Sequence, residues 1–172
     1  MIVAFDNTFL TLALNPSATP RPNPATGQPV SHCRERIEAL IDSFGPKDKV
    51  LIPTPVLAEV LCVAEDCDQI LTVTRNVACF DVVPFDARSA YELAQMTRAA
   101  IAAGDKKDGE IEPWQLIKLD RQIVAIAKAH GAKVLYSDDI PQSNFAIRAG
   151  LEVRHTWNLE LPDTHAQLRL EV

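Results

Sequence analysis

The chain has 172 residues, of which 47% are hydrophobic and 23% are charged, and its formal net charge is -6 at pH 7. This composition is typical of a soluble globular protein, and the length favours one domain with a substantial hydrophobic core. The negative charge argues against a surface that attracts nucleic acid or anionic membranes by charge alone. Ordinary solubility is its simplest explanation; acidic side chains gathered as metal ligands are the alternative.

The chain starts with an apolar run, Met1–Phe5, that has no basic leader and reaches an acid at Asp6. This pattern is unlike a secretory signal, and no apolar run approaches the roughly 18 residues of a membrane helix. The four cysteines show neither C-x-x-C spacing nor a histidine at zinc-binding spacing. We therefore expect a cytoplasmic protein without membrane contact, whose reduced thiols are mostly buried, including Cys62 and Cys67.

In the first half of the chain, short apolar runs alternate with segments of helical spacing. Thr54-Pro55 is a strong helix start, and five prolines within residues 15–31 predict a loop. The expected elements are a strand at residues 1–6, the loop at 15–31, a helix at 33–44, a strand at 50–52 and a helix from Thr54 to about Val73.

The second half continues the alternation. Asp86 is expected to cap one helix and Gly131 to end another. The expected elements are a strand at residues 80–85, a helix from 86 to about 104, a polar loop at 105–114, a helix from Asp120 to about Gly131, a strand at 134–136, a short helix at 141–150 and an edge strand at 153–157.

This alternation predicts an α/β fold, a three-layer α/β/α sandwich with a mainly parallel central sheet. We expect a single domain at residues 1–157, with the loop at 15–31 inserted, and a polar C-terminal tail at 158–172.

Acidic residues occupy positions that share one edge of the expected sheet. Two strands end in acids, Asp6 and the pair Asp138-Asp139, while Glu59 and Asp120 lie near the starts of helices. Ligands of open α/β sheets bind beyond the carboxyl ends of the strands. Clustered carboxylates oppose one another's ionisation unless a cation is present. The pattern therefore indicates a Mg²⁺ site able to support hydrolysis at phosphorus.

Each acid also has a structural interpretation. Asp6 and the Asp138-Asp139 pair could be turn or cap residues, and Asp120 could simply cap its helix. Glu59 could be a surface acid, although its apolar neighbours weaken that interpretation. Their joint placement, rather than any single residue, favours a site.

The order of several short motifs resembles a known family. The chain reads Asp6-x-Thr8, then Pro55-x-x-x-Glu59-Val60, then Asp120-x-x-Ile123-x-Ala125-x-Ala127 with Gly131, then Val134-Leu135-x-Ser137-x-Asp139. This order resembles a PIN domain. Residues 80–86 and the alanine-rich helix after them resemble the middle of VapC-type toxins, so the resemblance covers residues 1–14 and about 46–155.

The resemblance implies a Mg²⁺- or Mn²⁺-dependent ribonuclease, often a homodimer, which a cognate antitoxin blocks in toxin members. It implies a catalytic and metal-binding role for the four acids Asp6, Glu59, Asp120 and Asp139. Asp138 is the alternative to Asp139 as the fourth acid. Thr8 matches a small polar residue that helps to hold the metal, and Ser137 matches a hydroxyl beside the site.

The net negative charge is unusual for an RNA-binding protein, which normally contacts phosphates through Lys and Arg. The candidates for such contacts are Lys106, Lys107, Lys118 and Arg121, for which solvated surface charge is at least as good an explanation. The loop at 15–31 and the segment at 104–118 also make the chain longer than a compact toxin.

Two other functions fit parts of the pattern. A catalytically silent PIN-like binding module would need only the fold, but the complete set of acids argues against it. A phosphoryl-transfer enzyme would use Asp6 as nucleophile, but phosphatases of the haloacid-dehalogenase type need Asp-x-Asp and this chain has Asp6-Asn7-Thr8. The leading prediction is a metal-dependent endoribonuclease.

Overall fold

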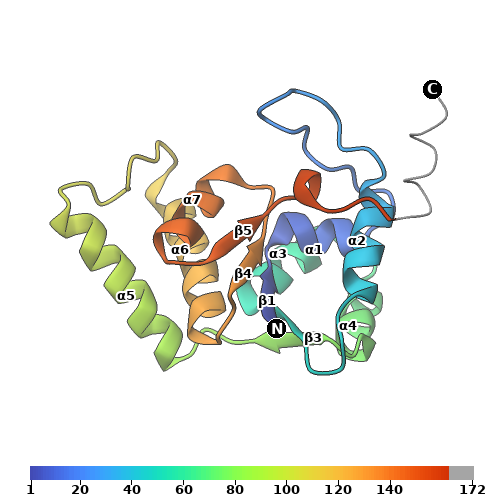
Figure 1. Ribbon diagram of the computed structural model, residues 1–172. Helices are drawn as coiled ribbons and strands as arrows, with labels where there is room; N and C mark the ends of the chain where they lie inside the picture. The colour runs from blue at the N-terminus through green and yellow to red at the C-terminus, as the bar shows by residue number, and fades with distance from the viewer. Residues whose placement is uncertain (163–172) are drawn as a thin grey trace.

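The computed structural model describes residues 1–162, and the part of the predicted tail at 163–172 lies outside the described residues. Five parallel strands form one sheet in the order β3-β2-β1-β4-β5 (Figure 1). The strands of this described part are β1 (Ile2–Phe5), β2 (Lys49–Pro53), β3 (Phe80–Val83), β4 (Val134–Tyr136) and β5 (Glu152–Arg154). The mainly parallel sheet is confirmed, and every described pairing is parallel.

Helices connect the strands as crossovers. They are α1 (Asn7–Leu14), α2 (Cys33–Asp42), α3 (Thr54–Val63), α4 (Cys67–Asn76), α5 (Ala87–Ala102), α6 (Trp114–Ala129) and α7 (Ile140–Arg148), followed by the 3-10 helix η1 (Thr156–Asn158).

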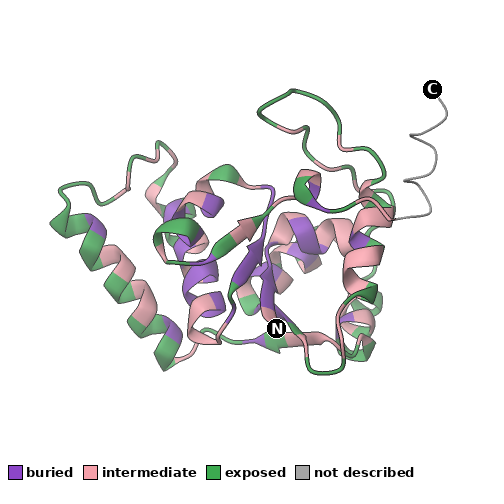
Figure 2. Ribbon diagram, in the orientation of Figure 1, coloured by how far each residue is buried: buried purple, intermediate pink, exposed green. Residues whose placement is uncertain are grey.

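The central strands are apolar on both faces, so each face is covered by helices. Val3 and Phe5 of β1 pack in the hydrophobic cluster that contains Phe9 of α1 and the buried residues of α2 and α3. Ala4 packs in the opposite cluster with most of the buried apolar residues of α6 and with Phe145 and Ala146 of α7. Figure 2 shows that the buried residues concentrate on β1, β4 and the inner sides of these helices. The predicted three-layer sandwich is therefore confirmed, with α5 packed on α6 through contacts such as Lys128–Glu92 at 3.0 Å.

Two predicted helix boundaries were wrong. The helix expected from Thr54 to Val73 is divided into α3 and α4, because the Asp66 side chain caps a new helix by accepting a hydrogen bond from the Gln69 amide at 2.9 Å. The helix expected to open at Asp120 begins at Trp114, immediately after Pro113. Asp120 therefore lies inside α6, away from the helix start.

Three further details differ from expectation. Residues 153–157 form β5 and then η1. Leu159 packs in the core and its carbonyl accepts a hydrogen bond from Arg36, so the fold continues past residue 157. Cys62 and Cys67 are exposed, which corrects the expectation of burial, and all four cysteines are free. None of the helices within residues 1–162 combines the length and hydrophobicity of a membrane-spanning segment.

Candidate active site

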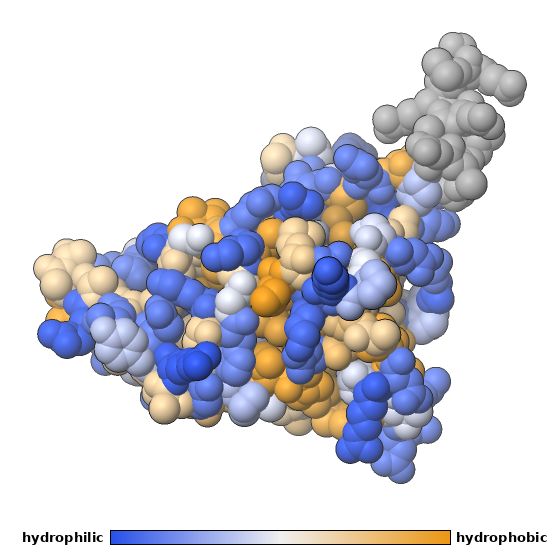
Figure 3. Space-filling model, turned by 60° about the horizontal axis from the view of Figure 1, so that its bottom comes forward, coloured by the Kyte–Doolittle hydropathy of each residue, from blue (hydrophilic) through white to orange (hydrophobic). Residues whose placement is uncertain are grey.

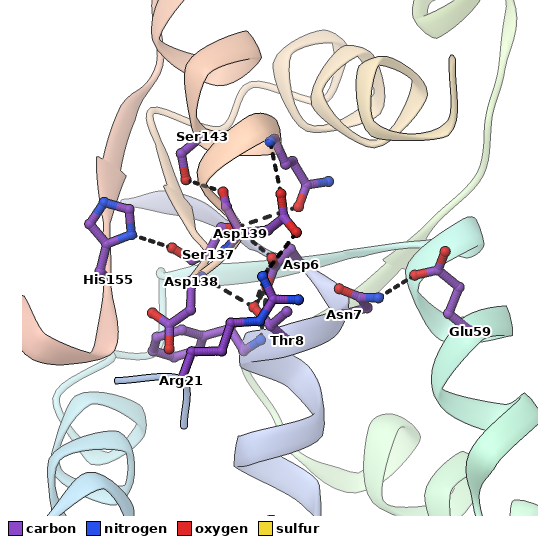
Figure 4. A network of polar contacts seen from close by, with 12 residues as sticks. Asp6, Asn7, Thr8, Arg21, Glu59, Ser137, Asp138, Asp139, Ser143 and His155 are labelled. Atoms are coloured by element: carbon purple, nitrogen blue, oxygen red, sulfur yellow. Dashed lines mark hydrogen bonds and ion pairs between the residues drawn. The ribbon is translucent and has the colours of Figure 1, made fainter. Parts of the chain in front are cut away.

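Asp6 lies at the junction of β1 and α1, where it caps the helix. Its Oδ1 accepts hydrogen bonds from the Phe9 amide at 2.7 Å and the Thr8 hydroxyl at 2.8 Å, and its Oδ2 accepts one from the Ser137 hydroxyl (Figure 4). The side chain is fully buried. Burial raises the pKa of Asp6 to about 7, although these hydrogen bonds oppose the shift; the neighbouring Asp138 charge adds to it.

Ser137 and Asp139 follow β4, the strand that pairs with β1. The Asp139 amide donates to the Ser137 hydroxyl at 3.0 Å, and Ser137 donates to Asp6, so one hydroxyl joins the ends of both strands. Asp139 caps α7 by accepting a hydrogen bond from the Gln142 amide at 3.0 Å. Its Oδ2 also lies 3.4 Å from Arg21 Nη1, which comes from the proline-rich loop.

Asp138 has a different environment from its neighbour. Its Oδ1 accepts a hydrogen bond from the Thr156 amide at 2.8 Å, and its Oδ2 accepts one from the Thr156 hydroxyl at 2.7 Å. The Asp138 amide donates to the Thr8 hydroxyl at 3.1 Å. Both carboxylate oxygens therefore hold the start of η1, and Figure 4 shows the side chain pointing away from Glu59.

Glu59 projects from α3, whose buried positions Val56 and Val60 hold the helix on the core. The Asn7 side-chain amide donates a hydrogen bond to Glu59 Oε2 at 2.5 Å, which fixes the carboxylate next to the end of β1. Burial raises the pKa of Glu59, the Asn7 hydrogen bond lowers it, and the charge of Asp139 raises it.

Asp120 lies on the side of α6 that also carries Leu116, Leu119 and Ile123. The pKa of Asp120 is raised from 3.8 to about 7, and burial contributes most to this rise. The remaining causes, in decreasing order, are the negative charges of Asp139, Glu59, Asp6 and Glu112. Carboxylates from four separate segments therefore influence Asp120 electrostatically.

Glu59, Asp120 and Asp139 line an open cleft of about 370 Å³. Its polar wall consists of Asn7, Arg21, Glu59, Glu112, Asp120, Asp139 and Gln142. Asp6 does not reach the wall: it is buried at the base of this region, next to Asn7. The structure thus brings together three of the four principal predicted acids in one cleft and places the fourth beside it.

Residues 30–147 match the model of the PIN domain family. The chain belongs to the PIN domain family. Three solved structures are similar to it. FitAB bound to an IR36 DNA fragment has 20% identity and a TM-score of 0.60, and the match covers 94% of this chain and 99% of that chain. VapBC2 from Rickettsia felis bound to a promoter DNA fragment has 16% identity and a TM-score of 0.56, with coverages of 90% and 98%, and VapBC-1 from nontypeable Haemophilus influenzae has 12% identity and a TM-score of 0.59, with coverages of 91% and 98%. No curated protein gives a significant match. The PIN resemblance and the PIN-like fold are confirmed.

The donor set of this PIN domain fits a hard divalent cation, because the cleft offers carboxylate and amide oxygens and no thiol or imidazole. One buried oxygen, Glu112 Oε2, accepts no hydrogen bond from any described residue. Within residues 1–162, no three acidic, His or Cys side chains already converge on a single point as ligands. Instead the acids are held separately by Ser137, Asn7 and Arg21, as expected for like charges that repel one another.

The four basic candidates for RNA contact occupy different environments. Arg121 is fully buried, with Nη2 2.6 Å from Asp108 Oδ2, so it is removed from the candidates. Lys106 lies over the Trp114 ring, and the Lys107 ammonium donates to a backbone carbonyl. Lys118 is exposed, but it precedes Asp120 by two residues, which places it on the opposite side of α6 from the cleft.

Four polar residues of the cleft were missed by the sequence reasoning: Asn7, Arg21, Glu112 and Gln142. Asn7 directly follows Asp6, so its proximity to the site had a local signal. Glu112 lies two residues before the start of α6 at Trp114, so helical spacing does not relate it to Asp120, and no local signal marked it. Arg21 had no signal, because its position depends on how the proline-rich loop folds.

Proposed function

We propose that this PIN domain is a metal-dependent endoribonuclease that hydrolyses RNA phosphodiester bonds in the acidic cleft. The observation that carries the proposal is the meeting of Glu59, Asp120 and Asp139, from α3, α6 and the end of β4, in one cleft beside Asp6. The cleft lies at the carboxyl edge of a parallel sheet, where ligands of such sheets bind.

Mg²⁺ or Mn²⁺ is the proposed cofactor; when bound, it would activate water and stabilise charge on the phosphate. The proposed ligands are the acids Glu59, Asp120 and Asp139, which line the cleft, and Asp6, which lies beside it. Asp138 is the weaker candidate because its side chain is turned away from the cleft, toward Thr156. The chain itself orients these groups. Asn7 holds Glu59, while Ser137 and Thr8 hold Asp6.

The proposed partners are RNA as substrate, a cognate antitoxin and a second copy of this chain. The antitoxin proposal is supported by the similar structures, which are VapBC and FitAB complexes. A band of hydrophobic residues between hydrophilic ones on the face seen in Figure 3 supports contact with another protein, because exposed apolar patches are typical of such surfaces.

Two alternatives are weaker. A silent binding module does not account for three of the predicted acids sharing one cleft, where burial and then the charges of Asp139 and Glu59 raise the pKa of Asp120 to about 7. Phosphoryl transfer through Asp6 would need its carboxylate to reach a substrate phosphorus, whereas Asp6 is fully buried and does not line the cleft.

The test is incubation of the purified protein with total RNA in Mg²⁺, Mn²⁺ or EDTA, followed by mapping of the cut ends. We expect cleavage that EDTA abolishes and that Asp120→Asn reduces by at least about 100-fold, because a charge needed in the transition state is removed. Asp68→Asn, on the exposed surface of α4, is the matched control and should cleave normally. Cleavage that persists in EDTA, or full activity of Asp120→Asn, would contradict the proposal.

A further inference from the structure

The segment between α5 and α6, residues 103–113, is held in place by polar contacts. The Asp105 carboxylate accepts hydrogen bonds from the amides of Lys107 at 2.8 Å and Gly109 at 2.6 Å. Asp108, in the left-handed conformation with φ of 57°, is paired with the buried Arg121. This segment overlaps residues 104–118, identified from the sequence as one of two segments longer than in a compact toxin, and its own side chains hold its backbone.

The same segment carries Glu112 to the acidic cleft. The Lys107 ammonium donates a hydrogen bond to the Glu112 carbonyl at 2.8 Å, which fixes the backbone just before Pro113 and the start of α6. On the other side, Glu110 is directed toward α7, with Oε1 3.2 Å from Asn144 Nδ2. Glu110 therefore contacts α7, whereas Glu112 lines the cleft with Asp120.

The Glu112 carboxylate has an unsatisfied oxygen. Its Oε2 is buried, and no described residue donates a hydrogen bond to it. A buried carboxylate oxygen without a donor is costly, and Glu112, a partly exposed residue, lines a cleft that already holds three other acids. A structural acid would be expected to find a donor or reach solvent. An oxygen left without a donor among several carboxylates is instead suited to bind a cation or a water molecule of its hydration shell.

We propose that Glu112 is a fifth carboxylate of the acidic site and that it binds the divalent cation, directly or through a coordinated water, together with Asp120. The proposal rests on the proposed metal-dependent function. It gives the segment at 103–113 a role, because this segment supplies a ligand that the shared PIN motifs of this chain do not include.

The test measures Mn²⁺ binding to the full metal-free chain by calorimetry, with thermal unfolding in the presence and absence of Mn²⁺ as a second readout. Glu112→Gln keeps the shape of the side chain and removes its charge. We expect it to weaken Mn²⁺ binding by about 10-fold, as is typical when a supporting ligand is lost, and to reduce the rise in melting temperature that Mn²⁺ produces.

Glu110→Gln is the matched control, because it removes one charge from the same segment but outside the cleft. It should bind Mn²⁺ within about twofold of the unaltered chain, because the Glu110 charge lies outside the cleft and is paired with Arg148 at 3.5 Å. Unchanged Mn²⁺ binding by Glu112→Gln would overturn the inference, as would an equal loss in both variants. If the unaltered chain binds no Mn²⁺ and cleaves no RNA, the proposed function itself fails; if it does both and only Glu112→Gln is neutral, the inference alone fails.

Discussion

Arg21 Nη1 lies 3.4 Å from Asp139 Oδ2, so a cation of the proline-rich loop stands at the mouth of the acidic cleft (Figure 4). The two residues are 118 positions apart in the chain. The Arg21 side chain is 62% exposed, so the ion pair itself contributes little, about 0.2–1 kcal/mol for pairs of this kind. Its importance is electrostatic, because it places positive charge where a divalent cation would bind.

Removal of the Arg21 charge should favour binding of a divalent cation in the cleft. We expect Arg21→Ala to tighten Mn²⁺ binding by up to about fivefold, the equivalent of roughly 1 kcal/mol. Calorimetric titration of the metal-free chain measures the change. Arg34→Ala, which removes an exposed arginine paired with Glu38 on α2, is the control and should leave Mn²⁺ binding unchanged. Weaker binding by Arg21→Ala would show that the guanidinium supports the site instead.

The adjacent acids Asp138 and Asp139 should respond differently to the same substitution. Asp139→Asn should reduce cleavage by about 100-fold or more, because it removes a charge from the cleft. Asp138→Asn should cleave RNA nearly normally but lose about 1–3 kcal/mol of unfolding free energy, because an amide cannot accept both hydrogen bonds from Thr156. Urea denaturation and RNA cleavage on both variants separate the two effects. Equal loss of activity in both would contradict the assignment.

The metal-free protein should become less stable as pH rises from 5 to 8. Burial raises the pKa of both Asp6 and Asp120 from 3.8 to about 7, so between these values the folded chain binds more protons than the unfolded chain. The free energy of unfolding then decreases with increasing pH until both groups are ionised. Melting temperatures in EDTA across this range test the expectation. The Asp120→Asn side chain cannot titrate, so this variant should show a smaller change of melting temperature with pH. A melting temperature that rises toward pH 8 would contradict the predicted loss of stability.

The buried Arg121 should make the fold depend on Asp108. Asp108 Oδ2 lies 2.6 Å from Arg121 Nη2, while the Nε and Nη1 atoms of Arg121 have no hydrogen-bond acceptor among the described residues. Asp108→Gly tolerates the positive φ but leaves a buried guanidinium unpaired, and we expect a loss of about 3 kcal/mol in urea denaturation. Asp108→Asn keeps an oxygen acceptor and should lose less. Equal stability of all three chains would indicate that solvent reaches Arg121.

Local signals account for what the sequence predicted well. Apolar runs such as Ile2–Phe5 and Val134–Tyr136 identify strands buried on both faces, and side chains such as Asp86 identify helix starts. Boundaries failed where a local signal was misinterpreted. Asp120 was interpreted as a helix cap, although Pro113 marks the actual start of α6.

The sequence by itself determined the parallel α/β sandwich and the sheet edge at which the acids would gather, because strand and helix signals depend on neighbouring residues. Only the tertiary structure decided which side chains face the cleft. Asp138 turns to Thr156, Arg121 is buried beside Asp108, and Arg21 and Glu112 enter from loops. These outcomes depend on contacts between residues far apart in the chain, and the direction of a side chain is settled by the partners available to it after the backbone has folded.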